Sequence, residues 1–250
     1  MRRPALVLMA ILTVWTCAFA QTGGSASQPT AQTRITASAV WQPHADFLSK
    51  AHLVCDRGAG PMSFPECFMN QMAAAGAPAD AVAFTRMLYQ QSDGEIGIMS
   101  AFKQYGAVDA AQVLYPLRAN NNYGLLLVNG GPTPLDVDDL QKLDRAAMEH
   151  DNLFQSIKQR YAQTDVWPGD RSGANPWPRA ETLPVGGTRF IVTYPLLDGC
   201  HACRRVGLAR FGWDFDASGK FLHTTFIPTP PPPKILPRPG RPQPPQSQHP

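Results

Sequence analysis

TRFIVTYPLLDGCHACRRVGLARFGWDFDASGKFLHTTFI, residues 188–227, predicts three successive β-strands. The strands span Thr188–Leu197, Arg205–Phe215 and Lys220–Ile227, and a short polar segment joins each strand to the next. Along the middle strand every second residue is apolar, and these residues share one face: Ala209, Phe211, Trp213 and Phe215. Short connections join antiparallel neighbours, so we expect these strands to form hairpins.

The segment before these hairpins predicts two more strands and a helix. The strands are expected at Val108–Tyr115 and Tyr123–Val128, on either side of an asparagine-rich turn. A helix is expected from Pro134 to about Tyr161, because aspartates gather at its start and apolar residues recur at helical spacing.

The first half of the chain is predominantly helical in its pattern. Helices are expected at Pro43–Val54, Phe64–Ala75 and Pro78–Gln91. Ile96–Tyr105 is ambiguous between helix and strand, and we assign it to helix. The predicted fold class is therefore α+β, with N-terminal helices followed by a mostly antiparallel sheet in the order strand-strand-helix-strand-strand-strand.

The amino terminus has the features of a secretory signal peptide. Arg2 and Arg3 precede the apolar run Ala5–Val14, and Ala18-Phe19-Ala20 places small residues where signal peptidase requires them. The expected localisation is therefore export, to the periplasm or the extracellular space. A lipid anchor at Cys17 is the alternative, which the bulky residues before it disfavour.

Composition divides the rest of the chain. After the signal peptide (1–20), residues 21–37 are polar and are expected to be a disordered linker. Residues 228–250 form a proline-rich tail, also expected to be disordered, that favours an extended polyproline II conformation. Between them we expect a single α+β domain over residues 38–227, with a helical part over 38–105 and a sheet part over 106–227.

Charge and hydropathy restrict the class of partner. Removing Arg2 and Arg3 with the leader leaves 20 basic residues against 19 acidic ones, without a basic stripe. This balance disfavours a nucleic-acid partner. No apolar run after the leader approaches the ~20 residues of a transmembrane helix, so no such segment is expected. The identity of a protein or small-ligand partner and the oligomeric state stay open.

Four cysteines follow the leader: Cys55, Cys67, Cys200 and Cys203. An even number in an exported chain predicts two disulfides. Of the three possible pairings we expect Cys55–Cys67 and Cys200–Cys203, because each pair flanks a predicted turn. The larger of the two closed loops is expected to stabilise the fold by about 3 kcal/mol.

Cys200-His201-Ala202-Cys203 also permits a redox interpretation. His201, together with the arginines after Cys203, would favour a reactive thiolate. The motif lies between two predicted strands, however, and lacks the helix N-terminus that stabilises such a thiolate. A structural disulfide is therefore preferred, and an envelope thiol–disulfide protein that uses Cys200 and Cys203 is the alternative. Zinc would lack a fourth ligand here.

Two acidic segments resemble metal sites only in part. Asp214–Gly219 matches the first half of a calcium loop, but Thr225 occupies the position that needs a bidentate carboxylate, so a turn is preferred. Three further aspartates are assigned to the start of a helix: Asp136, Asp138 and Asp139. We therefore predict no metal site and no cofactor.

The long loop Thr164–Gly187 contains two tryptophans among prolines and glycines, Trp167 and Trp177. Packing of the rings onto the sheet is the simpler interpretation. Two aromatic rings on a long loop also suit recognition of a sugar or a peptide. We take both tryptophans as the candidate binding residues.

No sequence motif of a nucleophilic or zinc hydrolase is present, so no catalytic residue is assigned. The predicted function is an exported non-enzymatic protein that binds a protein or small ligand through a disulfide-stapled α+β domain. A hydrolase site assembled from residues distant in sequence stays open. The proline-rich tail is a second candidate for docking on aromatic grooves.

Overall fold

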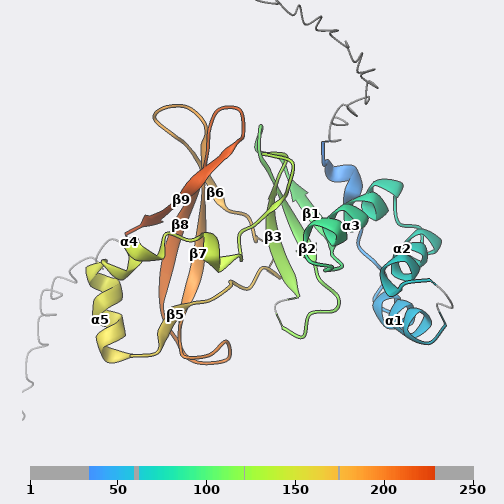
Figure 1. Ribbon diagram of the computed structural model, residues 1–250, viewed down its shortest axis with the longest axis horizontal. Coiled ribbons are helices and arrows are strands. Elements are labelled where there is room, and N and C mark those ends of the chain that lie inside the picture. The colour runs from blue at the N-terminus through green and yellow to red at the C-terminus, as the bar shows by residue number, and fades with distance from the viewer. Residues whose placement is uncertain (1–33, 59–61, 121, 174, 229–250) are drawn as a thin grey trace, which may run out of the picture. The chain divides into compact units, whose positions relative to one another are not determined.

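The computed structural model describes residues 34–58, 62–120, 122–173 and 175–228. The expected signal peptide, most of the expected linker and the tail from residue 229 lie outside the described residues. Helices come first and antiparallel strands follow (Figure 1). The predicted α+β class is thereby confirmed.

Three helices follow a single 3-10 turn, η1 (Ala37–Ala39), and occupy the segments where helices were predicted. Their bounds are α1 (Phe47–Gly58), α2 (Phe64–Ala74) and α3 (Ala79–Gln91). Pro78 precedes α3, where its fixed φ and missing N–H suit a helix start.

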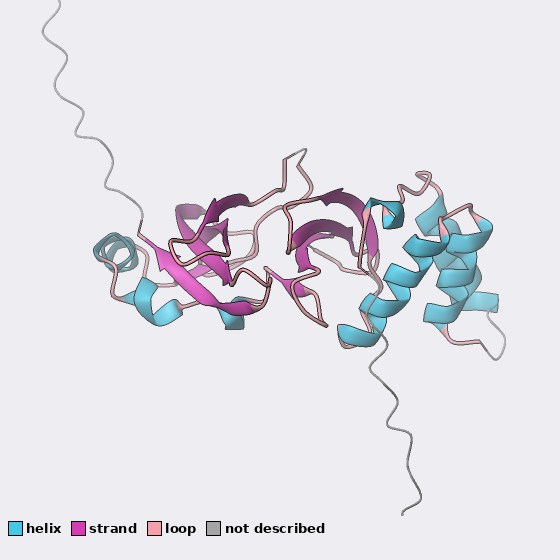
Figure 2. Cartoon of the chain, turned by 90° about the horizontal axis from the view of Figure 1, so that it is seen from above, coloured by secondary structure: helices cyan, strands magenta, loops and turns pink. Residues whose placement is uncertain are grey.

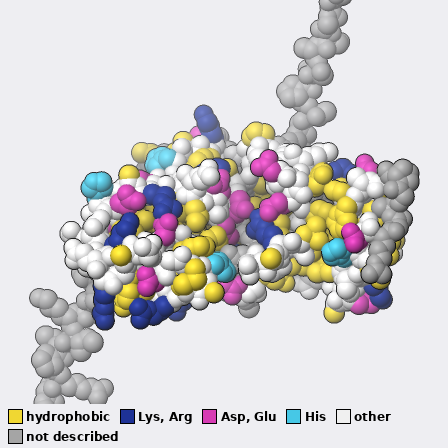
Figure 3. Space-filling model, turned by 60° about the horizontal axis from the view of Figure 1, so that its bottom comes forward, with side chains coloured by type: hydrophobic (Ala, Val, Ile, Leu, Met, Phe, Trp, Pro, Cys, Tyr) yellow, Lys and Arg dark blue, Asp and Glu magenta, His cyan; other side chains and the backbone are white. Residues whose placement is uncertain are grey.

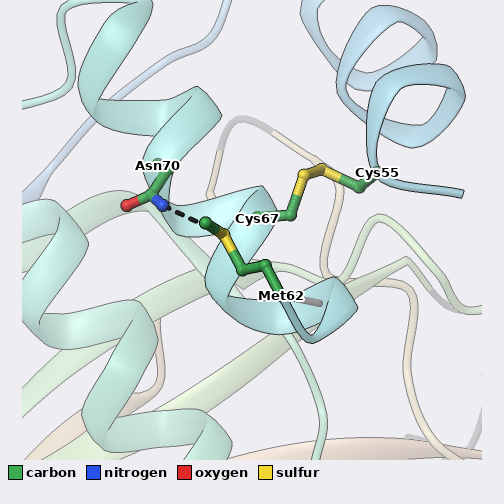
Figure 4. The surroundings of a disulfide bond; sticks show 4 residues. All are labelled: Cys55, Met62, Cys67 and Asn70. Carbon is green, nitrogen blue, oxygen red and sulfur yellow. Dashed lines mark hydrogen bonds between the residues drawn. A yellow bond between two sulfur atoms is a disulfide. The ribbon is translucent and has the colours of Figure 1, made fainter. Parts of the chain in front are cut away.

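The Cys55–Cys67 disulfide joins α1 to α2 (Figure 4). Its partners lie 12 residues apart, and both are buried in a cluster with Phe47, Phe68 and Met72. Both predicted disulfide pairings are present, because Cys200 is bonded to Cys203. The domain is therefore stapled at its helical end and at one hairpin.

The strands form two antiparallel sheets. Sheet A has the order β1 (Ile98–Lys103), β2 (Asp109–Leu114), β3 (Tyr123–Val128) and β4 (Leu135–Asp136). In sheet B the order is β5 (Thr164–Val166), β7 (Thr188–Asp198), β8 (Arg205–Phe215) and β9 (Phe221–Ile227), and β6 (Arg179–Thr182) also pairs with β7. The three strands of residues 188–227 form the predicted hairpins.

The helix assigned to Ile96–Tyr105 is wrong, because this segment forms β1. A β-bulge leaves Ser100 without a partner residue, so Met99 pairs with Val113 and Ala101 with the next residue back along β2. The extra residue brings Met99 and Phe102 onto the same face of the sheet, against α3. Their three-residue spacing is typical of a helix, and it concealed the strand.

The single helix expected from Pro134 to about Tyr161 is also wrong in its extent. The segment contains β4, the 3-10 turn η2 (Leu140–Lys142), α4 (Arg145–Glu149) and α5 (Asn152–Arg160). Of the three aspartates assigned to the helix start, only Asp139 caps a helical turn, η2, because Asp136 lies in β4 and Asp138 pairs with Arg171. The side chains of Asp144 and Asp151 accept backbone N–H groups at the starts of α4 and α5.

Sheet A packs between helices and sheet B (Figures 1 and 2). On one face, Leu126 and Val128 contact Phe84 of α3 and its neighbours. On the other face, Leu125 and Leu127 belong to the cluster formed by sheet B, which includes the four alternating residues of β8: Ala209, Phe211, Trp213 and Phe215. The predicted inward face of β8 is confirmed.

Residues 34–37, assigned to the linker, lie on the domain. The Ile35 N–H donates to Asn129 Oδ1 at 2.8 Å, and Asn129 Nδ2 donates to the Ile35 carbonyl at 2.8 Å. Asn129 is held in turn by Asp109, at 2.8 Å. Among the described residues, no helix combines the length and hydropathy that a membrane span requires.

Candidate functional site

A cavity of about 400 Å³ lies where the loop between β5 and β6 passes the edge of β7. The apolar part of its lining comes from β3, β7 and the loop: Leu125, Ile191, Val192, Pro176, Trp177 and Pro178. Three arginines also line it, Arg171, Arg179 and Arg210, against one acidic residue, Asp170. We call this cavity the arginine pocket.

Arg171 is the buried cation of the arginine pocket, with 7% of its surface exposed. Its Nη2 donates to Asp138 Oδ1 at 2.9 Å, and its guanidinium lies 5.5 Å from the centroid of the Tyr194 ring. Gln112 on β2 holds its backbone by donating to its carbonyl. A Cβ at Gly169 would lie 2.9 Å from Arg171 Nη1, so glycine there makes room for the guanidinium.

Arg210 supplies a positive charge that no carboxylate neutralises among the described residues. Its Nη2 donates to the Pro228 carbonyl at 2.8 Å, next to the end of β9. The Nε atoms of Arg210 and Arg171 are both buried without a hydrogen-bond partner in the described part of the chain. Arg179 is mostly exposed and pairs with Glu181 at 2.6 Å.

The two predicted tryptophans occupy different places. Trp177 is partly buried, packs on the main core cluster and also lines the arginine pocket. Trp167 lies outside the pocket lining: its backbone N–H donates to the Pro195 carbonyl at 3.1 Å, and its ring centroid is 5.9 Å from that of His201. The structure therefore brings only Trp177 into the pocket, and binding by either residue stays a prediction.

Cys200 and Cys203 lie in the connection between β7 and β8, as predicted, and are exposed. The Asp198 N–H donates to the Arg204 carbonyl at 3.1 Å and closes the hairpin around the disulfide. The chain continues from there into β8 rather than into a helix. This geometry suits a hairpin staple, which also holds His201 against Trp167.

Of the segment Asp214–Gly219, the first two residues end β8 and Asp216–Gly219 form the turn toward β9, as preferred over a calcium loop. Asp216 Oδ1 accepts hydrogen bonds from the Ser218 and Lys220 backbones at 2.9 and 3.0 Å. Gly219 has φ +90°, which favours glycine. The Asp214 carboxylate is bound by Arg189 through two bonds of 2.6 Å. Among the described residues, no three acidic, histidine or cysteine side chains form a metal-binding group.

A second cavity, of about 540 Å³, lies between α3 and sheet A and has an acidic lining. Its carboxylates largely have internal partners: Glu95 accepts from Arg118 at 2.9 Å, and Asp139 from Lys142. The Arg118 guanidinium stacks 3.6 Å from the Tyr115 ring centroid. We therefore do not assign a ligand to this cavity.

Asp136, in the acidic cavity, is expected to titrate near neutral pH. Burial, followed by the negative charge of Asp138, raises its pKa to about 7 from the ordinary 3.8. The folded state then keeps a proton that the unfolded state releases, so the free energy of unfolding should fall as the pH rises from about 4 to 7. Carbon-13 NMR of the carboxyl groups measures this pKa, and Asp136→Asn should remove the slope. A midpoint near 4 would contradict the expectation.

Charges of both signs are interspersed over the face shown in Figure 3, and hydrophobic side chains gather toward the end that holds α1–α3. No single-sign field covers this face.

Sequence reasoning missed Arg171 and Arg210. The alternation of β8 predicts that Arg210 points away from the core, but it does not show that a loop covers that position. Arg171 lies in a loop without periodicity. The one local signal is the glycine two residues before it, which marks a close backbone approach.

No family model, curated protein or solved structure matches this chain.

Proposed function

We propose that this chain is an exported, non-enzymatic binding protein whose disulfide-stapled α+β domain takes an acidic ligand in the arginine pocket. The observation that carries the proposal is that Arg171 and Arg210 line one pocket beside Trp177 and that no carboxylate of the described residues pairs with Arg210. A carboxylate on the ligand would supply the counter-charge that Arg210 lacks.

Guanidinium groups suit this ligand class. They present fixed donors that match the two oxygens of a carboxylate. The charge of Arg171 is already balanced by Asp138, whereas that of Arg210 lacks a carboxylate partner among the described residues. The apolar wall formed by Trp177, Ile191 and Val192 suits an aliphatic body attached to the acidic group.

Export is supported by the leader-like amino terminus and by two disulfides, which persist in oxidising compartments. The hairpin disulfide, Cys200–Cys203, is connected to the arginine pocket through two contacts. It holds His201 against Trp167, whose backbone in turn binds the edge of β7 next to the arginine pocket.

The test is calorimetric titration with glutarate, a dicarboxylate, and with glutaramide, its neutral isostere. Glutarate should bind and glutaramide should not, and Arg210→Gln should weaken glutarate binding at least fivefold. Arg86→Gln, on the exposed face of α3, is the matched control and should leave the affinity unchanged. Equal binding of the two probes, or no effect of Arg210→Gln, would refute the proposal.

The alternative is a thiol–disulfide protein that uses Cys200 and Cys203. Its support is the exposure of the pair and the adjacent Arg204 and Arg205. Catalysis of insulin reduction that is lost in Cys200→Ser would establish it, and an inert wild-type protein would leave the staple as the role of this pair.

A further inference from the structure

We propose that the ligand of the arginine pocket is an amino acid, whose carboxylate binds Arg210 and whose ammonium group binds Asp170 in the loop between β5 and β6. This inference rests on the proposed function and specifies the chemistry of its ligand. Its basis is that the lining holds one cation and one anion for which the described part of the chain provides no ion-pair partner.

Four charged side chains line the arginine pocket, and two of them are neutralised by carboxylates outside the lining. Arg171 pairs with Asp138 at 2.9 Å. Arg179 pairs at 2.6 Å with Glu181, which also lies on β6. These pairs leave one cation and one anion of the lining without a counter-charge.

Arg210 is the cation that remains. It lies on β8 opposite Thr193 of β7, which also lines the pocket. Its Nη2 donates to the Pro228 carbonyl at 2.8 Å, and a carbonyl group carries no net charge. A carboxylate that enters the pocket would therefore supply a charge-assisted hydrogen bond that no described residue gives to Arg210.

Asp170 is the anion that remains. Its Oδ1 accepts from the Ser172 hydroxyl at 2.6 Å and from the Ser172 backbone N–H at 2.9 Å. The hydroxyl bond, followed by the backbone bond, lowers the pKa of Asp170 below the ordinary 3.8, so this carboxylate is charged at neutral pH. Its Oδ2 takes no hydrogen bond from the described residues, because both bonds go to Oδ1. An ammonium group in the pocket could donate to Oδ2.

The neighbouring residue holds the backbone of Asp170 in place. Arg171 is buried, although Asp170 itself is exposed. Asp138 anchors Arg171 through its guanidinium, and Gln112 anchors it through its carbonyl. The bonds from Ser172 restrict the rotation of the Asp170 carboxylate in addition. A group that is already ordered binds a ligand with a smaller loss of conformational entropy.

Opposite charges in one pocket favour a ligand that carries both. A dicarboxylate supplies a counter-charge for Arg210 but none for Asp170. An amino acid supplies both, because it carries a carboxylate and an ammonium group at neutral pH. The apolar wall of Trp177, Ile191 and Val192 suits the methylene groups of such a ligand.

The experiment is calorimetric titration of the full chain with the unbranched aminocarboxylates from glycine to 6-aminohexanoate. Each is compared with the carboxylate in which a methyl group replaces the ammonium group, so that 5-aminopentanoate is compared with hexanoate. The series varies the spacing of the two charges. At least one aminocarboxylate should bind at least fivefold more tightly than its methyl counterpart, although the apolar wall favours the methyl group. Ratios below fivefold throughout the series would overturn the proposal.

A variant of the protein provides a second readout. Asp170→Asn removes the charge and keeps the Oδ1 that accepts both bonds from Ser172. The aminocarboxylate that binds best should lose at least fivefold in affinity, whereas glutarate should bind at least as tightly as before, because a like charge has been removed. Asp56→Asn, on the exposed face of α1, is the matched control and should change neither affinity. Equal losses for both ligands in Asp170→Asn would show a structural role and overturn the assignment.

The outcomes separate the two proposals. If glutarate binds in an Arg210-dependent manner but no aminocarboxylate exceeds its methyl counterpart fivefold, recognition of the ammonium group is refuted and the acidic-ligand pocket stands. If neither glutarate nor any aminocarboxylate binds, both proposals are refuted.

Discussion

Replacing Arg171 by methionine is expected to lower the free energy of unfolding by about 3–5 kcal/mol, because it leaves the Asp138 carboxylate buried without its counter-charge. Both side chains are only 8% exposed, and their ion pair spans 2.9 Å. Methionine retains the apolar stem against Tyr194 and removes the charge. Urea unfolding at pH 7 measures the change.

The double variant Arg171→Met, Asp138→Leu is the control for this assignment. It removes both charges together, and replacing a whole buried ion pair by apolar residues is often neutral. Most of the lost stability should therefore return. A single variant that loses less than about 1 kcal/mol would show that Asp138 is adequately solvated without Arg171.

Asp109→Asn is expected to destabilise the domain by about 2–4 kcal/mol. Asp109 is fully buried on β2 and accepts four hydrogen bonds through its two carboxylate oxygens. The donors are the Tyr105 and Gly106 backbone N–H groups at 2.9 and 3.2 Å, Arg34 Nη2 at 2.5 Å and Asn129 Nδ2 at 2.8 Å. An asparagine presents an NH₂ group to donors on one side, so two of the bonds are lost.

Arg34→Gln distinguishes the carboxylate from its ion pair. Arg34 is about half exposed, so its loss should cost under about 1 kcal/mol. Asp109→Asn should also speed hydrogen exchange at Ile35, whose N–H depends on Asn129. Equal, small losses in the two variants would contradict a structural role for Asp109.

Sequence patterns predicted the helices and strands in which buried residues recur at the regular period of the helix or strand. The alternation in residues 205–215 matches the inward face of β8, and the helices of the first half lie where the 3.6-residue spacing placed them. Local interactions that interrupt a pattern were not predictable. The bulge at Ser100 and the caps at Asp144 and Asp151 each depend on one backbone or side-chain contact.

The division into two sheets was not predicted either, because pairing between segments distant in sequence leaves no mark on local periodicity. β4 and β6 contain two and four residues, too few for an alternation to be recognised. The two disulfides were predicted from spacing and predicted turns alone, and both are present.

The candidate site was predictable only in part. Trp177 was singled out by its loop, and it lines the arginine pocket. Arg171 meets Asp138 across 33 residues and Gln112 across 59, so its burial depends on tertiary packing. One amino-acid sequence does not show which residues distant along the chain come into contact. The proposed binding chemistry therefore rests on the structure and not on a sequence motif.

The central claim is that Arg171 and Arg210 bind an acidic group through the guanidinium groups that line the arginine pocket. The most direct measurement is a nitrogen-15 correlation spectrum of the arginine Nε–H groups during a glutarate titration. The Arg171 and Arg210 signals should shift together and saturate, while that of the exposed Arg86 stays in place. If the two pocket signals stay fixed, or shift no more than that of Arg86, the account is contradicted.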